Sequence, residues 1–163
     1  MVARSIRARR PNARVRDART PRGLLLACSR AVTSSAHQFR VLVADDDPAI
    51  RSLVARIFIR RGYDVASASD GADAIQKLDH DEPYDLLVLD LMMPRVDGVG
   101  VINHLAKREG PRPAILVMTA AVPDILRRLP REHVAKVISK PFDLDQLTQY
   151  ADEAIRETNS SAS

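Results

Sequence analysis

The sequence has few of the features that mark disulfide-stapled or membrane-spanning proteins. It contains one cysteine, Cys28, so no disulfide can form within the chain, and this excludes a small secreted domain held together by disulfides. No apolar run approaches the roughly 20 residues of a membrane-spanning helix. Tryptophan is absent and aromatic residues make up 4% of the chain, yet 45% of the residues are hydrophobic. That fraction is enough for the core of one domain of ordinary size.

The positive charge of the chain is confined to its first 38 residues. This segment carries nine arginines and one acid, Asp17, for a net charge of +8, whereas residues 39–163 carry a net charge of −4. Residues 1–38 also contain prolines, a Ser/Thr/Ala stretch and no aromatic residue. Such a composition cannot bury enough surface to offset its ordering entropy. We therefore predict a disordered, arginine-rich extension over residues 1–38.

Several roles are open for this extension. An arginine-rich, acid-poor segment resembles an organelle transit peptide or an arm that binds phosphate backbones. Residues 25–28 resemble a lipoprotein cleavage box, but the apolar core of a secretory signal is missing. A basic segment without aromatic residues or a fold provides no sequence-specific readout of nucleic acid. We favour a solvated extension of a cytoplasmic protein with no membrane association; nucleic acid would be a partner only through this extension.

Residues 39–158 alternate between apolar strands and amphipathic helices. Five apolar runs predict buried strands at residues 39–44, 64–69, 84–89, 114–118 and 134–138. Helices are expected at residues 48–61, 71–78, 99–107 and 143–157. Between the last two strands, Pro123 and Pro130 leave room for only a turn or two of helix. The alternation predicts one α/β domain with a parallel sheet covered on both faces and right-handed crossovers, followed by a short tail at residues 159–163.

Polar side chains follow four of the five predicted strands. They are Asp45 and Asp46, Asp90, Thr119 and Lys140. In an open α/β sheet, ligands bind beyond the carboxyl ends of the strands. Three carboxylates in a partly desolvated cleft repel one another unless a cation neutralises them. All-oxygen ligands suit Mg²⁺, with Mn²⁺ as a second possibility, so the sequence predicts a divalent metal site at this edge.

The same residues suit phosphoryl chemistry. Asp90 ends the most hydrophobic strand, and a carboxylate there can attack phosphorus to form an acyl phosphate. The ammonium of Lys140 and the hydroxyl of Thr119 can contact the charged phosphoryl oxygens. Each residue alone could be an ordinary turn or surface residue. Their occurrence at successive strand ends indicates a shared site.

From about Phe39 to Arg156, the chain resembles the receiver domain of bacterial two-component response regulators. The matching motifs are Val41–Pro48, Asp85–Pro94 followed by Asp97 and Gly98, Met118–Ala120, and Ser139–Phe142. The resemblance implies a doubly wound, flavodoxin-like five-stranded sheet with strand order 2-1-3-4-5. It also implies phosphorylation of Asp90, and an Mg²⁺ site formed by Asp45, Asp46, Asp90 and the backbone carbonyl of Met92.

The resemblance further implies how the signal enters and leaves. Thr119 and Lys140 are implied to contact the phosphoryl group, and the Lys140–Pro141 bond to be cis. The donor is implied to be a histidine kinase or a histidine phosphotransfer protein, and the output a downstream protein target. Thr119 and Val137 are implied to be the switch residues. At the position of Val137, three residues before Lys140, the family usually has Tyr or Phe. Because no output domain follows, we expect a stand-alone, chemotaxis-receiver-like regulator of a two-component system or phosphorelay.

Besides a nucleic-acid-binding regulator that works through the arginine-rich extension, two alternatives remain open at this stage. Haloacid-dehalogenase-type phosphatases also use Mg²⁺ and a strand-end aspartate, and Asp45–Asp47 fits their Asp-x-Asp start. However, Ala49 stands where they have Thr or Val, and Asp143 and Asp145 lie at a predicted helix start rather than at a strand end. The second alternative is a receiver-like module that works without phosphorylation, for which Val137 leaves room. We predict a phosphoacceptor that assists its own phosphorylation and dephosphorylation, not an enzyme.

Overall fold

A computed structural model of the protein describes residues 38–120 and 123–161. The predicted arginine-rich extension lies outside the described residues except for Gln38, so its disorder stays a prediction. None of the helices in the described ranges is long and apolar enough to cross a membrane.

Five parallel strands form one sheet in the order β2-β1-β3-β4-β5, which confirms the order implied by the resemblance. The strands are β1 (Arg40–Ala44), β2 (Asp64–Ala68), β3 (Leu86–Leu89), β4 (Ala114–Thr119) and β5 (Lys136–Ser139). Since β2 and β3 lie on opposite sides of β1, the winding direction reverses between β1 and β3. In this register Ala44 pairs with Leu89, so the residues that follow these two strands are neighbours.

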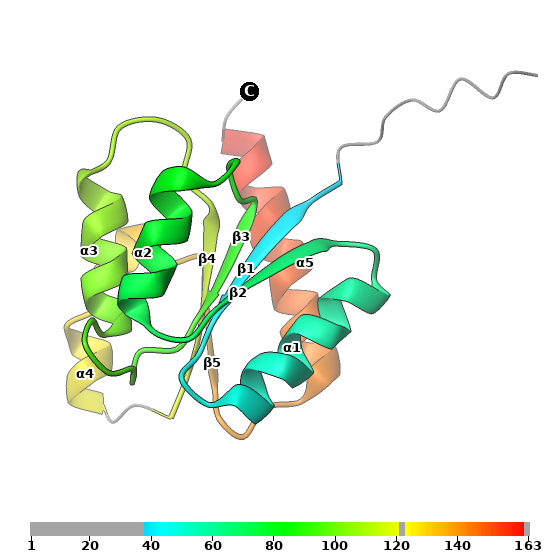
Figure 1. Ribbon diagram of the computed structural model, residues 1–163, viewed down its shortest axis with the longest axis horizontal. Helices are drawn as coiled ribbons and strands as arrows, with labels where there is room; N and C mark the ends of the chain where they lie inside the picture. The colour runs from blue at the N-terminus through cyan, green and yellow to red at the C-terminus, as the bar shows by residue number, and fades with distance from the viewer. Residues whose placement is uncertain (1–37, 121–122, 162–163) are drawn as a thin grey trace, which may run out of the picture. The chain divides into compact units, whose positions relative to one another are not determined.

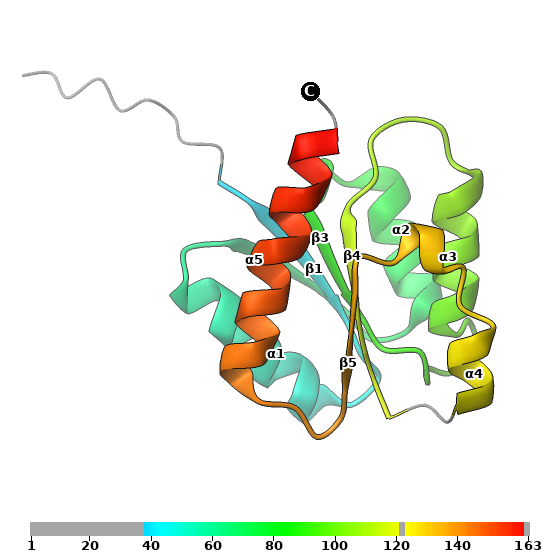
Figure 2. The same cartoon turned by 180° about the vertical axis from the view of Figure 1, so that it is seen from behind.

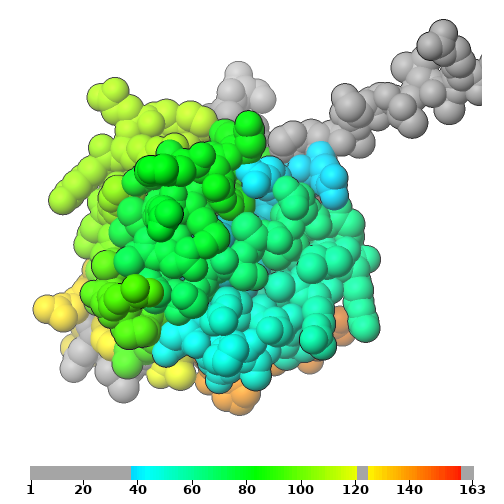
Figure 3. Space-filling model, in the orientation of Figure 1, coloured from blue at the N-terminus to red at the C-terminus, as the bar shows by residue number. Residues whose placement is uncertain are grey.

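Helices cover both faces of the sheet, as predicted. They are α1 (Pro48–Arg60), α2 (Gly71–His80), α3 (Gly98–Lys107), α4 (Pro123–Arg127), the short 3₁₀ helix η1 (Arg131–His133) and α5 (Leu144–Ser161). The helices α1 and α5 lie on one face, and α2, α3 and α4 lie on the other (Figures 1 and 2). In the space-filling view, their side chains leave little of β1 (light blue) visible (Figure 3).

The core has two halves because alternate residues of each strand point to opposite faces. Val41 and Val43 of β1 pack with Phe58 of α1 and Leu147 of α5. Leu42, between them, packs into the other half with residues of α2 and α3. The strands β1, β3 and β4 are therefore buried on both sides, which explains why each is a continuous apolar run.

The start of α1 is set by Asp47 and Pro48, as the sequence predicts. The Asp47 carboxylate accepts hydrogen bonds from the backbone N–H groups of Ala49 (2.8 Å) and Ile50 (3.2 Å). Pro48 occupies the first helical position, where no backbone donor is needed. The helix therefore begins immediately after the acidic residues that follow β1.

Several element boundaries differ from the prediction. The strands β3 and β5 begin two residues later than expected. Tyr84 and Val134 pack on the core from outside the sheet, which explains why their apolar side chains extended the predicted strands. The helix α5 runs to Ser161 instead of ending near residue 157, so the start of the predicted tail at 159–163 is helical. No glycine or proline follows Glu157 to stop it. The five-residue α4 confirms that the prolines permit only a short helix.

Candidate functional site

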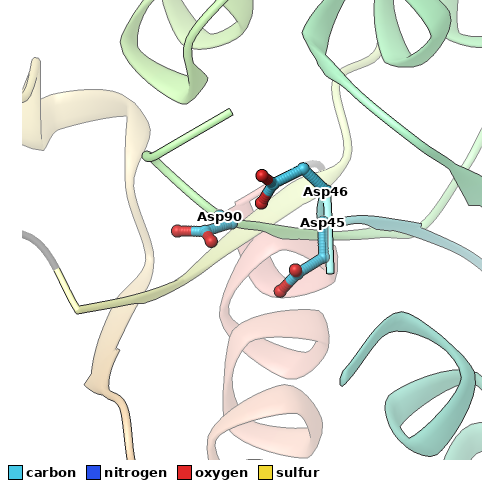
Figure 4. A group of neighbouring side chains, drawn as sticks. All are labelled: Asp45, Asp46 and Asp90. Carbon is cyan, nitrogen blue, oxygen red and sulfur yellow. The ribbon is translucent and has the colours of Figure 1, made fainter. Parts of the chain in front are cut away.

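Three aspartates meet at the carboxyl edge of the sheet, where β1 and β3 end. Asp45 and Asp46 follow β1, and Asp90 follows β3. One carboxylate oxygen of each lies within 4.8 Å of the others (Figure 4). Asp45 and Asp90 are buried, whereas Asp46 is exposed. We call these three residues the acid cluster; the structure brings them together as the sequence predicts.

Lys140 is the cation of this site. Its Nζ donates hydrogen bonds to Oδ2 of Asp45 (2.7 Å) and to Oδ2 of Asp90 (2.6 Å). Burial by itself would lower the pKa of Lys140, but the hydrogen bonds to the two carboxylates raise that pKa above its usual value. The side chain is therefore an ammonium ion. The peptide bond from Lys140 to Pro141 is cis, as the resemblance implied.

The two buried carboxylates also accept backbone hydrogen bonds on their other oxygens. Oδ1 of Asp45 accepts from the N–H of Asp47 (2.9 Å), and Oδ1 of Asp90 accepts from the N–H of Met92 (3.1 Å). Burial raises the pKa of Asp45 above its ordinary value, and the hydrogen bonds from Lys140 and Asp47 oppose that shift. Met92 thus lies directly beside Asp90 through its backbone, while about half of its side chain is exposed.

The positions of Thr119 and Val137 follow from the pairing of β4 and β5. Thr119 is the last residue of β4 and is buried at the same edge of the sheet as the acid cluster. Its carbonyl accepts the backbone N–H of Lys140 at 2.9 Å. Val137 lies three residues before Lys140 on the edge strand β5, with 40% of its surface exposed.

Sequence reasoning missed Arg51, and it recognised Gly98 only as part of a motif, without its packing role. The guanidinium of Arg51, on α1, donates from Nη1 to the carbonyl oxygens of Asp45 (2.6 Å) and Asp46 (3.4 Å). Its position near the start of α1 was a usable signal, because helical side chains lean toward the helix N-terminus. Gly98, at the start of α3, packs on the backbone of Asp90, where an added Cβ would lie 2.3 Å from the carbonyl oxygen.

The donor set of the site fits a hard divalent cation. The acid cluster and Lys140 together carry a formal charge of −2, which a divalent ion balances. Carboxylate and carbonyl oxygens are the ligands that Mg²⁺ prefers, and it retains water at its remaining positions. The site also lies at the point where the winding of the sheet reverses, as ligand sites of doubly wound folds do.

Fold and site together define a doubly wound, flavodoxin-like domain with an acidic site at the switch point of its sheet. The family model of the response regulator receiver domain matches residues 41–152. The response regulator MprA of Mycobacterium ulcerans (strain Agy99) is 38% identical over 126 residues, which cover 73% of this chain and 51% of that protein. MprA of Mycobacterium leprae (strain TN) is 37% identical over the same length.

Solved structures agree with this match. The receiver domain of the Francisella response regulator 1452 superposes with a TM-score of 0.65 at 27% identity, covering 74% of this chain and 99% of that one. A CheY-like receiver domain protein from Methanospirillum hungatei JF-1 has a TM-score of 0.69 over 76% of this chain and 98% of that one; its 22% identity shows the fold alone. The chain belongs to the response regulator receiver family of two-component signalling. It spans about half the length of the curated relatives it matches.

Proposed function

We propose that this chain is a phosphoacceptor, and that Asp90 receives a phosphoryl group from a histidine kinase or a histidine phosphotransfer protein. The observation that carries the proposal is the Asp90 carboxylate itself, held by the Lys140 ammonium within the acid cluster. Family membership adds the context of two-component signalling. A cytoplasmic location and a downstream protein target belong to the same proposal.

The proposed step is an in-line displacement at phosphorus. A carboxylate oxygen of Asp90 forms the new O–P bond, the P–N bond to the donor histidine breaks, and the imidazole keeps the electron pair and takes up a proton. Lys140, already 2.6 Å from the Asp90 carboxylate, neutralises charge on the phosphoryl oxygens. The hydroxyl of Thr119, at the end of the adjacent strand, donates a hydrogen bond to the same group.

The proposed metal is Mg²⁺, for which Mn²⁺ can substitute. Asp45, Asp46, Asp90 and the backbone carbonyl of Met92 would hold it, and when bound it supplies positive charge next to the phosphoryl oxygens. Asp45 and Asp90 are oriented for this role by hydrogen bonds to both of their carboxylate oxygens.

The proposed output uses Thr119 and the exposed Val137. A movement of Thr119 toward the phosphoryl group is passed to β5 through the hydrogen bond from Lys140 N–H to the Thr119 carbonyl. Val137, exposed on the same edge strand, then presents the change to a protein partner.

The phosphatase alternative is disfavoured by the place of its second acidic pair. The carboxylate of Asp143 accepts hydrogen bonds from the backbone N–H groups of Asp145 (2.7 Å) and Gln146 (3.3 Å), as an N-cap does. This carboxylate therefore caps the start of α5. Neither Asp143 nor Asp145 belongs to the acid cluster. A receiver-like module without phosphorylation remains the competing proposal.

The experiment is incubation of the full chain with acetyl phosphate and Mg²⁺, followed by intact-mass analysis. In this reaction the phosphorus–oxygen bond to acetate breaks and acetate leaves. We expect a single phosphoryl adduct that disappears when Mg²⁺ is chelated and in the Asp90→Asn variant. An adduct that survives in Asp90→Asn, or no adduct under conditions that label another receiver domain, contradicts the proposal.

A further inference from the structure

The three carboxylates of the acid cluster differ in how they are held. Asp45 and Asp90 each accept hydrogen bonds on both oxygens, from Lys140 and from backbone N–H groups. The Asp46 carboxylate is exposed and accepts no hydrogen bond from residues 38–120 or 123–161. No hydrogen bond in these ranges therefore holds the carboxylate itself, and the backbone that carries Asp46 decides where it can reach.

That backbone is anchored by Arg51. Its guanidinium Nη1 lies 2.6 Å from the carbonyl oxygen of Asp45 and 3.4 Å from that of Asp46, so it contacts the chain on both sides of the Asp46 α-carbon. Arg51 is itself held in place because its backbone N–H bonds to the carbonyl of Asp47 at 2.9 Å, in the first turn of α1. On the other side, the N–H of Asp45 bonds to the carbonyl of Ala68 in the neighbouring strand β2 at 3.2 Å.

We infer that Arg51 is a positioning residue, which directs the Asp46 carboxylate toward Asp90 and so raises the affinity of the acid cluster for Mg²⁺. The inference rests on the proposed function, because it assumes that the cluster binds this cation. Arg51 acts through the peptide groups of the ligand residues and not as a ligand. Groups that orient metal ligands typically contribute a factor of 10 to 100 in metal affinity.

The charge of Arg51 acts in the opposite direction, because a guanidinium near the acid cluster repels a divalent cation. Two substitutions separate the two effects. Arg51→Lys keeps the charge but replaces the planar fork with a single ammonium on a flexible stem, which cannot hold both carbonyls in the same way. Arg51→Met removes the anchor and the repulsion together.

The experiment measures the Mg²⁺ dissociation constant by isothermal titration calorimetry on the full chain, without any phosphoryl donor. The matched control is Arg56→Lys, because Arg56 is an exposed arginine on the same helix with no hydrogen bond or ion pair within the described ranges. We expect Arg51→Lys to bind Mg²⁺ about 10-fold more weakly than the wild type. Arg51→Met should fall between these two, and Arg56→Lys should match the wild type.

Each other result decides against the inference. If Arg51→Lys and the wild type bind Mg²⁺ with equal affinity, the positioning role is overturned. If Arg51→Met binds Mg²⁺ more tightly than the wild type, the repulsion by the charge of Arg51 outweighs any positioning, and the inference is overturned as well. A loss of affinity that merely follows a lower thermal midpoint indicates a role in folding alone. If the wild type binds no Mg²⁺, the proposed metal site fails and Arg51 has no such role; the acetyl phosphate experiment then shows separately whether Asp90 still accepts phosphate.

Discussion

Replacing Lys140 with methionine removes the cation that contacts the carboxylates of Asp45 and Asp90. Methionine preserves much of the length and the apolar stem of the side chain, so the change is chiefly electrostatic. The variant leaves two buried carboxylates, those of Asp45 and Asp90, each without one charged hydrogen bond. Removing one partner of a buried ion pair typically costs about 3–5 kcal/mol. The Lys140 side chain is 13% exposed, which places the expected loss near the lower limit, at about 3 kcal/mol.

The assay is urea unfolding followed by circular dichroism, with and without Mg²⁺. A bound cation stabilises the folded state by RT ln(1 + [L]/Kd), about 2.7 kcal/mol when its concentration is 100 times Kd. Because the positive charge of Lys140 repels a divalent cation held by the same carboxylates, Mg²⁺ should stabilise Lys140→Met more than the wild type at equal concentration. Mg²⁺ should therefore recover much of the lost stability.

The matched control is Lys136→Met. Lys136, at the start of β5, forms ion pairs with Glu153 and Glu157 at 3.1 Å, but these pairs lie on the surface, where such contacts contribute little. The reasoning is refuted if Lys140→Met lowers the free energy of unfolding no more than Lys136→Met does. It is equally refuted if Mg²⁺ stabilises the wild type and Lys140→Met to the same extent.

Two further predictions concern a glycine that packs on Asp90 and an aspartate on α2. Gly98→Ala places a Cβ against the Asp90 backbone, and overpacking of this kind should lower the free energy of unfolding by about 1–3 kcal/mol; Gly100→Ala, whose closest contacts are side-chain atoms, should cost less in the same urea assay. Burial would raise the pKa of Asp73, but hydrogen bonds, first from Lys77, hold that pKa below its usual value. Its contribution to stability is present above its unfolded pKa and is lost as pH falls through the lower folded pKa. Asp73→Asn should therefore flatten the acid limb of the stability profile, and an unchanged limb would exclude this role.

The position of the acid cluster could be predicted from the sequence because it depends on strand ends alone. In a parallel sheet, the residue after each buried strand lies at the same edge, so Asp45, Asp90 and Lys140 meet there whatever the details of packing. The cis bond at Pro141 and the strand order came instead from the family resemblance, since no local pattern specifies either. The sheet and the two helical layers were predictable for the same reason as the cluster.

The remaining features depend on tertiary contacts that no local pattern contains. The sequence predicts strands that include Tyr84 and Val134 because apolar residues indicate buried positions. Burial alone does not distinguish a residue in a strand from one in the connection that precedes it. The contacts of Arg51 run from a side chain to two backbone carbonyls, so they leave no paired charge in the sequence. Gly98 was part of a recognised motif, but its close approach to Asp90 is visible only in three dimensions.

The backbone hydrogen bond from Lys140 to Thr119 joins the two residues that we propose to contact the phosphoryl group. Thr119 ends β4 and Lys140 directly follows β5, which pairs with β4, so the backbone of the sheet sets the spacing between the residues that carry these two donors. One of the two strands, β5, is bonded on one side only, because it ends the sheet. In the proposed function, a partner that binds along this outer edge would contact the strand that leads into Lys140, so partner binding and phosphorylation of Asp90 would influence each other.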